Sequence, residues 1–167
     1  MTTTTMEVPY SYLTTQFNPA NPLVQDILND ISDELTRGGF TLGLWVEKFE
    51  QAICDRFGVK HCVGLNSGTD ALFLGLKVMG IGPGDTVATV SNTFVATVGA
   101  IVAAGAKPVL VDAGNDYQMD MSQVDESSIS AIIPVHLTGL AKPFKSVPKV
   151  LNDAAQAIDA QYGGQNV

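Results

Sequence analysis

Apolar residues recur at helical spacing near the start of the chain. Four of them stand at every fourth position: Leu23, Ile27, Ile31 and Leu35. This spacing places them on one face of a helix. Asn21 provides an N-cap, Pro22 fits the first helical position because its missing N–H would have no partner there, and Gly38 ends the pattern. A second helix is predicted from about residue 46 to residue 57, before Gly58. We interpret both as packing helices rather than as functional elements.

From residue 60 onward, short apolar segments alternate with helical patterns. The predicted strands are 61–65, 86–90, 108–111, 131–135 and 150–151. Predicted helices follow the first two strands: one runs from the turn at 67–69 to about Met79, and the other from Thr93 to Ala104. Continuous apolar strands separated by helices indicate a parallel sheet that is covered on both faces. The predicted fold class is therefore α/β, with a mostly parallel sheet and helices on both faces.

The segment 136–149 interrupts this alternation. It contains Gly139, Pro143 and Pro148, so little of it is compatible with a helix. A crossover between parallel strands usually needs a dozen or more residues and most often includes a helix. We therefore expect one face of the sheet to lack part of its helical cover.

The first twenty residues differ from the rest of the chain. They are rich in threonine and are interrupted by Pro9 and Pro19, a composition typical of an extended segment. No internal repeat or low-complexity linker divides the remainder. We expect an N-terminal arm at 1–20 and one domain at 21–167.

Composition and charge narrow the function classes. Of the 167 residues, 46% are hydrophobic and 16% are charged, against roughly 25% charged in an average globular chain. The 17 acidic and 9 basic side chains give a net charge of −8. This charge argues against a general nucleic-acid-binding protein, because such a protein needs a basic surface. It does not exclude a single phosphate group held by backbone amides.

The sequence also bears on the compartment. Cys54 and Cys62 form neither a close metal-ligand pair nor a disulfide framework. Residues 1–9 lack the pattern of a secretory signal, and the small-apolar stretch 98–106 is shorter than the roughly 20 residues that span a bilayer. We expect a soluble cytoplasmic protein with no metal site and no membrane contact.

Candidate chemistry lies where predicted strands end, since ligands of open parallel sheets bind outside the carboxyl ends of the strands. The first group is Ser67-Gly68-Thr69. Gly68 allows an anion to approach the backbone, Thr69 adds a hydroxyl, and the following helix directs free N–H groups to the same place. The alternative is that Ser67 or Thr69 only caps the helix, and the segment has no P-loop lysine. A hydrolase using Ser67 is disfavoured because the nucleophile-elbow spacing is absent.

Two further residues complete this picture. Asp153 follows a short apolar strand, where an ionised carboxylate needs a cationic partner. It either caps a helical turn or holds a heteroaromatic nitrogen protonated, as in pyridoxal phosphate enzymes. Phe94 either stacks on such a ring or belongs to the core. Together these residues describe a phosphate cradle, a ring platform and a pyridinium partner at one edge of the sheet.

Five segments carry a family resemblance: FGVKHCVGLNSGTDAL at 57–72, GIGPGD at 80–85, TFVAT at 93–97, PVHL at 134–137 and NDAAQA at 152–157. In this order the chain resembles the DegT/StrS family of pyridoxal-phosphate-dependent sugar aminotransferases over roughly residues 20–165. The resemblance implies an incomplete large domain of the aspartate-aminotransferase type (fold type I). It also implies a homodimer with active sites at the subunit boundary. The implied reaction transfers an amino group from glutamate to a nucleotide-linked keto-sugar, in polysaccharide or amino-sugar biosynthesis.

The resemblance also implies roles for particular residues toward pyridoxal 5'-phosphate. The cofactor-binding residues carried over by motif are Ser67, Gly68, Thr69, Phe94, Asp153 and Gln156. Gly68 and Thr69 would hold the phosphate, and Phe94 would stack on the pyridine ring. Asp153 would pair with the ring nitrogen, while Gln156 would lie near the ring hydroxyl. His136 lies in a matching motif, but we interpret it as a structural residue.

One departure concerns catalysis. The family places its Schiff-base lysine downstream of the 152–157 motif, and the seven lysines of this sequence match no such motif. We therefore assign no catalytic residue within the chain and expect both the lysine segment and the C-terminal small domain to be absent from it. Two alternatives stay open. The chain is either the cofactor-binding portion of an aminotransferase or a non-catalytic pseudoenzyme that binds the cofactor or a partner subunit.

Overall fold

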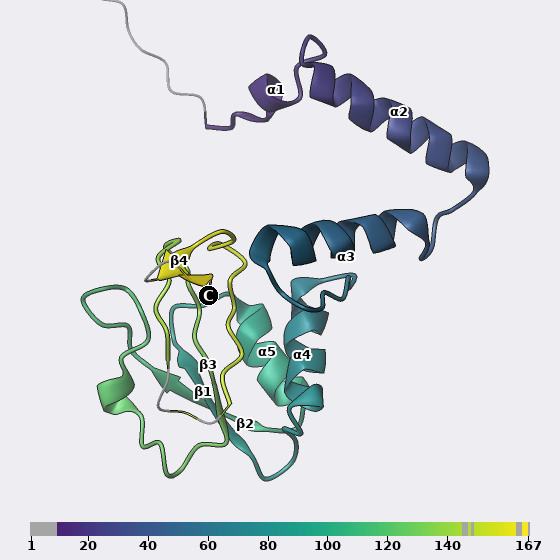
Figure 1. Cartoon of the computed structure of the whole chain (residues 1–167). Coiled ribbons are helices and arrows are strands. Elements are labelled where there is room, and N and C mark those ends of the chain that lie inside the picture. Colours follow the sequence, from purple (N-terminus) through teal and green to yellow (C-terminus); the bar gives the residue numbers. More distant parts are fainter. Residues whose placement is uncertain (1–9, 145–146, 148, 163–164, 167) are drawn as a thin grey trace, which may run out of the picture. The chain divides into compact units, whose positions relative to one another are not determined.

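The structure is a computed structural model that describes residues 10–144, 147, 149–162 and 165–166 (Figure 1). The chain forms two compact units, residues 1–49 and 50–167. Within the described part of the chain, no helix is long and apolar enough to cross a bilayer. The same residues hold no group of three His, Cys, Asp or Glu side chains arranged to bind a metal ion.

The first unit is helical. It contains the one-turn helix α1 (Leu13–Gln16), helix α2 (Pro22–Arg37) and the beginning of α3 (Leu44–Phe57). The Asn21 side chain accepts a hydrogen bond from the N–H of Leu23 at 3.1 Å, which confirms the predicted N-cap. Gly38 ends α2 in the left-handed conformation with φ of 72°, as a C-cap glycine does. Both predicted helices are confirmed.

The N-terminal arm is described only in part. Residues 1–9 lie outside the described residues. Within 10–20, the prediction of an extended segment is wrong where α1 forms, because the backbone N–H groups of Thr15 and Gln16 donate to the carbonyl oxygen of Tyr12. A local helical turn therefore outweighs the extended conformation that the flanking prolines favour.

The second unit is built around a parallel sheet. Its three strands are β1 (Thr86–Val90), β2 (Lys107–Val111) and β3 (Ala131–Ile133), in the order β2-β1-β3. Central strand β1 is parallel to both neighbours: Val87 aligns with Pro108 on one side and with Ala131 on the other. A short pair of antiparallel strands, β4 (Gln161–Tyr162) and β5 (Gln165–Asn166), follows. The predicted α/β class and the parallel arrangement are confirmed.

Helices cover one face of this sheet. Helix α4 (Gly68–Val78) and helix α5 (Val95–Ala103) pack together, and their buried side chains form one core cluster with the sheet. This cluster includes Leu76 from α4, Ile101 from α5 and Val87 from β1. All three side chains are fully buried, so they exclude water from the whole thickness of this layer.

Irregular segments cover the other face. Ala88, Val90 and Ile132 point into a second cluster, which Val124 and Phe144 help to close. The only helix within 112–130 is the short 3-10 helix η1 (Met121–Gln123), and the described part of 136–149 contains none. Among the described residues, this face therefore lacks helical cover, as expected from the glycine and prolines of 136–149. The prediction of helices on both faces of the sheet is wrong for this face.

Two predicted strands differ from the structure. Residues 61–65 form no strand, and residues 150–151 take part only in isolated bridges, which join Val150 to Ile132 and Asp153 to Val135. The apolar pattern marks both segments, but a strand also requires a hydrogen-bonding partner along its length. None of the described strands lies beside 61–65. The segment at 150–153 meets β3 where Pro134 has no N–H to donate.

Asp85 ties the loop before β1 to the segment before β3. Its carboxylate accepts hydrogen bonds from the Ser130 hydroxyl at 2.7 Å and from the Gly82 N–H at 2.8 Å. These hydrogen bonds favour the charged form and hold the pKa of Asp85 below its usual range. The carboxylate therefore joins two segments 45 positions apart in the sequence.

Candidate functional site

A cavity lies at the carboxyl ends of the parallel strands. Its volume is about 210 Å³. Five of the six residues predicted to bind a cofactor line it: Gly68, Thr69, Phe94, Asp153 and Gln156. They come from the start of α4, the start of α5 and the segment that follows the 150–151 strand prediction. The topology thus brings together three groups that are up to 88 positions apart (156 minus 68) in the sequence.

The sixth residue, Ser67, lies beside the cavity and caps α4. Its hydroxyl oxygen accepts a hydrogen bond from the N–H of Asp70 at 3.1 Å, and its carbonyl oxygen accepts one from Ala71. Among the described residues, the N–H groups of Gly68 and Thr69 have no hydrogen-bond partner. The helix-cap interpretation of Ser67 is therefore correct, and it leaves two backbone donors free at the helix N-terminus.

Space for an anion exists at this helix end. A Cβ atom placed on Gly68 would meet no atom within 4 Å, so glycine is not required there by contacts within the chain. The free donors and the positive end of the helix dipole both favour an anion in this space. The geometry therefore fits a phosphate group.

Asp153 is held on several sides. One carboxylate oxygen accepts a hydrogen bond from the Thr97 hydroxyl at 3.0 Å, and the other accepts one from the N–H of Ala155 at 3.3 Å. Its backbone donates to Pro134 and accepts from His136 at the end of β3. No regular helix follows Asp153 in the described chain, but a single turn does, in which the N–H of Ala157 donates to the carbonyl oxygen of Ala154. The carboxylate caps this turn through Ala155, so the capping alternative is correct as well. The carboxylate is half-buried and lines the cavity, where it has room for a cationic partner.

Phe94 forms a wall of the cavity rather than part of the core. It stands at the N-cap position of α5, and 72% of its surface is exposed. This exposure rules out the core alternative. A flat aromatic side chain that lines a cavity beside a carboxylate fits one face of a planar heteroaromatic ring.

Two residues of the site were not predicted from the sequence. Thr97 is fully buried and lines the cavity, and its hydroxyl lies 2.9 Å from that of Thr93. Thr93 also lines the cavity. The available sequence signal was a pair of threonines four residues apart at the start of a helix that is otherwise apolar, since this spacing places both on one helical face.

His136 is structural, as interpreted from the sequence. Only 1% of its surface is exposed. Its Nδ1 atom lies 3.0 Å from the side-chain oxygen of Gln118, and its Nε2 atom lies 3.3 Å from that of Asn152. The ring does not line the cavity. It connects β3 to two neighbouring segments instead.

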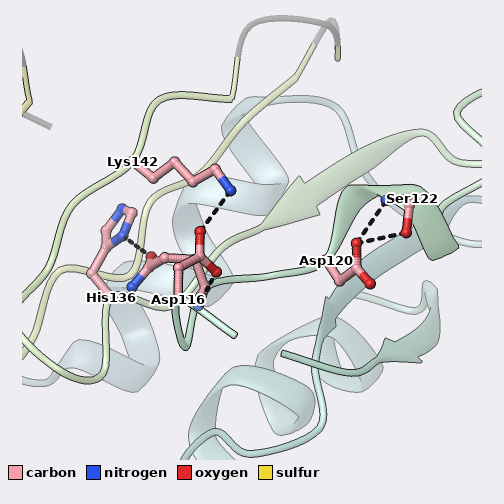
Figure 2. Close-up of polar contacts among 6 residues, drawn as sticks. Asp116, Asp120, Ser122, His136 and Lys142 are labelled. Atoms are coloured by element: carbon pink, nitrogen blue, oxygen red, sulfur yellow. Dashed lines mark hydrogen bonds and ion pairs between the residues drawn. The ribbon is translucent and has the colours of Figure 1, made fainter. Parts of the chain in front are cut away.

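The charged groups near His136 in Figure 2 also have structural roles. Lys142 pairs with Asp116 at 2.9 Å, and its hydrogen bond lowers the pKa of that carboxyl group. Asp120 caps η1 through the N–H and hydroxyl of Ser122, and this hydroxyl is the main cause of its lowered pKa. None of these groups lines the cavity. The candidate site is therefore limited to the ends of α4 and α5 and the 153–156 segment.

The sheet order, the helix end and the cavity define the class: an α/β protein with a candidate anion and ring site at the carboxyl ends of its parallel strands. A family model described as the DegT/DnrJ/EryC1/StrS aminotransferase family matches residues 22–167. The chain belongs to this family. The resemblance identified from the sequence is confirmed.

Individual relatives agree with this assignment. The chain is 37% identical to a "pleiotropic regulatory protein" of Geobacillus stearothermophilus, over 97% of this chain and 46% of that protein. It is 39% identical to a "UDP-N-acetyl-3-dehydro-alpha-D-glucosamine 3-aminotranferase" of Acidithiobacillus ferrooxidans, over 87% of this chain and 43% of that protein. The chain thus spans under half the length of these curated relatives.

Solved structures share the fold. DesV of S. venezuelae superposes with a TM-score of 0.84 and 34% identity, covering 98% of this chain and 46% of that one. NtdA of Bacillus subtilis, solved with bound cofactor PMP, superposes with a TM-score of 0.81 and 30% identity, covering 94% and 39%. Both comparisons confirm the predicted fold-type I architecture.

Proposed function

We propose that residues 21–167 form the cofactor-binding part of the large domain of a pyridoxal-phosphate-dependent aminotransferase. The proposed reaction transfers an amino group from glutamate to a nucleotide-linked keto-sugar. One observation carries the proposal: a chain of the aminotransferase family brings a free helix N-terminus, an exposed aromatic ring and a carboxylate to one cavity. The name of the Acidithiobacillus relative, an aminotransferase of a UDP-linked dehydro-sugar, supports the substrate class.

Each residue has a defined task in this proposal. The N–H groups of Gly68 and Thr69 bind the phosphate, with the positive end of α4 adding to the attraction. Phe94 stacks on the pyridine ring, and Asp153 keeps the ring nitrogen protonated. Gln156 lies beside the ring hydroxyl. When bound, pyridoxal 5'-phosphate supplies an electron sink for amino-group transfer.

The binding proposed for this chain is non-covalent. Among the described residues, no lysine lines the cavity. Stacking on Phe94 and the charge-assisted hydrogen bond to Asp153 together contribute about 2–4 kcal/mol. This contribution supports weak binding, to which the phosphate contacts add.

A second candidate is a non-catalytic protein that binds the same cofactor or a partner subunit. Both candidates place the site at the boundary of a homodimer. The exposure of Phe94 and Val95, at 72% each, supports a partner surface next to the cavity.

The test is a titration of the chain with pyridoxal 5'-phosphate, followed by absorbance and calorimetry. We expect saturable binding that Asp153→Asn and Phe94→Ala each weaken. Asp116→Asn is the matched control, because this carboxylate lies outside the cavity and is half-exposed. The absence of saturable binding, or equal loss in the control, would contradict the proposed site.

Borohydride reduction with bound cofactor tests whether the binding is non-covalent. Scattered or absent lysine labelling is expected for non-covalent binding. Stoichiometric labelling of one lysine, together with glutamate-dependent transamination, would instead show that this chain carries the complete reaction.

A further inference from the structure

A chain of hydroxyl groups leads from the start of α5 to Asp153. The hydroxyls of Thr93 and Thr97 lie 2.9 Å apart, and the Thr97 hydroxyl donates to a carboxylate oxygen of Asp153 at 3.0 Å. The last contact joins residues 56 positions apart in the sequence. It is a direct side-chain link between α5 and the segment that supplies Asp153.

The donor and acceptor of each of these hydrogen bonds follow from the chemistry of the groups. An ionised carboxylate only accepts hydrogen bonds, so the Thr97 hydroxyl must donate to Asp153. Its single proton is then committed, and its oxygen accepts from Thr93. Each hydroxyl therefore has one defined role, and the carboxylate keeps free lone pairs for a group in the cavity.

Asp153 depends on this link because its own segment is irregular. The backbone around it makes an isolated bridge to Val135 and belongs to neither a helix nor a strand. Among the described residues, its carboxylate accepts one other hydrogen bond, at 3.3 Å from the N–H of Ala155, two residues away on the same segment. A bond within one segment cannot fix the carboxylate relative to the rest of the cavity, whereas a bond from α5 can.

Thr97 is suited to this task. Its side chain is fully buried, on the same helix as the core residues Ala100 and Ile101. A β-branched side chain packed in this way has little rotational freedom. The same helix begins directly after Phe94. One rigid element thus holds the aromatic wall and, through Thr97, the carboxylate.

We propose that Thr97 is a positioning residue: with Thr93 behind it, Thr97 aligns the Asp153 carboxylate with the plane set by Phe94. The consequence for binding rests on the proposed function, in which Asp153 meets the ring nitrogen of the cofactor. The alignment of the Asp153 carboxylate does not depend on any ligand. The conformation of Asp153 and its effect on cofactor binding are therefore measured separately.

The ligand-free measurement is the side-chain rotamer of Asp153, read from three-bond NMR couplings to its carboxyl carbon. We expect one χ1 rotamer in the wild type and in Thr97→Ser, and averaged rotamers in Thr97→Val. Thr89→Val is the matched control, because Thr89 is also fully buried and its hydroxyl donates to the carbonyl oxygen of Ile133 at 2.7 Å, outside the cavity. A single Asp153 rotamer in Thr97→Val would overturn the inference.

The ligand measurement compares pyridoxal 5'-phosphate with its 1-deaza analogue, which lacks the ring nitrogen. The wild type should prefer the natural cofactor by about 10- to 150-fold, the range of one charge-assisted hydrogen bond. Thr97→Val should reduce this preference to under about threefold, and Thr97→Ser should restore it. A role limited to packing would weaken both ligands equally and leave the preference unchanged, which contradicts the inference.

The two failures are distinguishable. If the wild type binds neither ligand, the proposed function fails, and the rotamer measurement still decides whether Thr97 positions Asp153. If the wild type prefers the natural cofactor and Thr97→Val keeps that preference, the positioning role fails while the proposed function stands.

Should Thr97→Val not fold, Thr93→Val is used in both measurements, because Thr93 is only half-buried and its loss removes the donor behind Thr97. A smaller change in the same direction is then expected, and no change counts against the inference.

Discussion

Gly68→Ala separates binding of a phosphate from stability of the fold. The added Cβ meets no atom of the chain within 4 Å, so it causes no clash in the folded protein. Alanine also has the higher helix propensity, by up to about 1 kcal/mol in a helix interior. The variant should therefore be at least as stable as the wild type. The same methyl group enters the space where the phosphate would approach α4.

The size of the binding effect follows from the donors present. Two backbone N–H groups, those of Gly68 and Thr69, are free among the described residues at this helix end. A hydrogen bond to a charged group contributes about 1.5–3 kcal/mol. Displacing the phosphate from one donor should raise the Kd for pyridoxal 5'-phosphate by about 10- to 150-fold. Pyridoxal, which lacks the phosphate, should lose less than about threefold, because its ring contacts are unchanged.

Calorimetric titration with both ligands measures this difference, and urea denaturation measures stability. Gly99→Ala is the matched control, since Gly99 is an exposed glycine of α5 with equally open space and lies outside the cavity. The control should gain about 0.5–1 kcal/mol of stability and bind both ligands as the wild type does. Equal losses for both ligands in Gly68→Ala, or unchanged binding of the phosphate form, would refute the assignment of this helix end.

Three further outcomes are expected. Leu76→Ala should lower the free energy of unfolding by about 2–5 kcal/mol in urea denaturation, because Leu76 is fully buried between α4 and the sheet. Val78→Ala, at an 88% exposed position, should change the free energy of unfolding by under about 0.5 kcal/mol. Asp85→Asn should lower the free energy of unfolding at neutral pH, and the difference from the wild type should shrink as pH falls through the lowered pKa of Asp85. The reason is that protonation of the wild type removes the charged acceptor of the Ser130 hydroxyl. A difference that does not depend on pH would contradict this. At low micromolar concentration the chain should self-associate or bind a hydrophobic dye, and Ile31→Asp on the exposed apolar face of α2 should reduce either effect; a compact monomer without dye binding in sedimentation would exclude it.

Local sequence was sufficient for helices α2 to α5 and for the strands of the three-stranded sheet. Asn21, Pro22 and Gly38 predict the ends of α2 because capping depends on residues next to the helix in the chain. The strands β1, β2 and β3 follow from short apolar runs that are buried. The prediction failed at 61–65, where a strand required a partner that local pattern does not report.

The candidate site shows the same division. Motifs were sufficient to nominate Gly68, Phe94 and Asp153 as separate candidates, each with an ordinary structural alternative. Folding decided between the alternatives for Phe94, which is exposed on a cavity wall. It also placed Asp153 at the cavity, although the carboxylate caps a turn as well. These outcomes depend on which segments become neighbours in space, and residues next to each motif carry no information about that.

The sequence by itself determined helices α2 to α5, the three parallel strands, the family and the types of side chain available for chemistry, because these depend on local preferences and on motif order. Only the tertiary structure decided that the three polar groups share one cavity and that irregular segments cover one face of the sheet. It also decided that Thr97 holds Asp153 across 56 positions of the sequence. Such contacts form when distant segments are packed against one sheet, so their partners are set by packing of the whole unit and not by any single stretch of sequence.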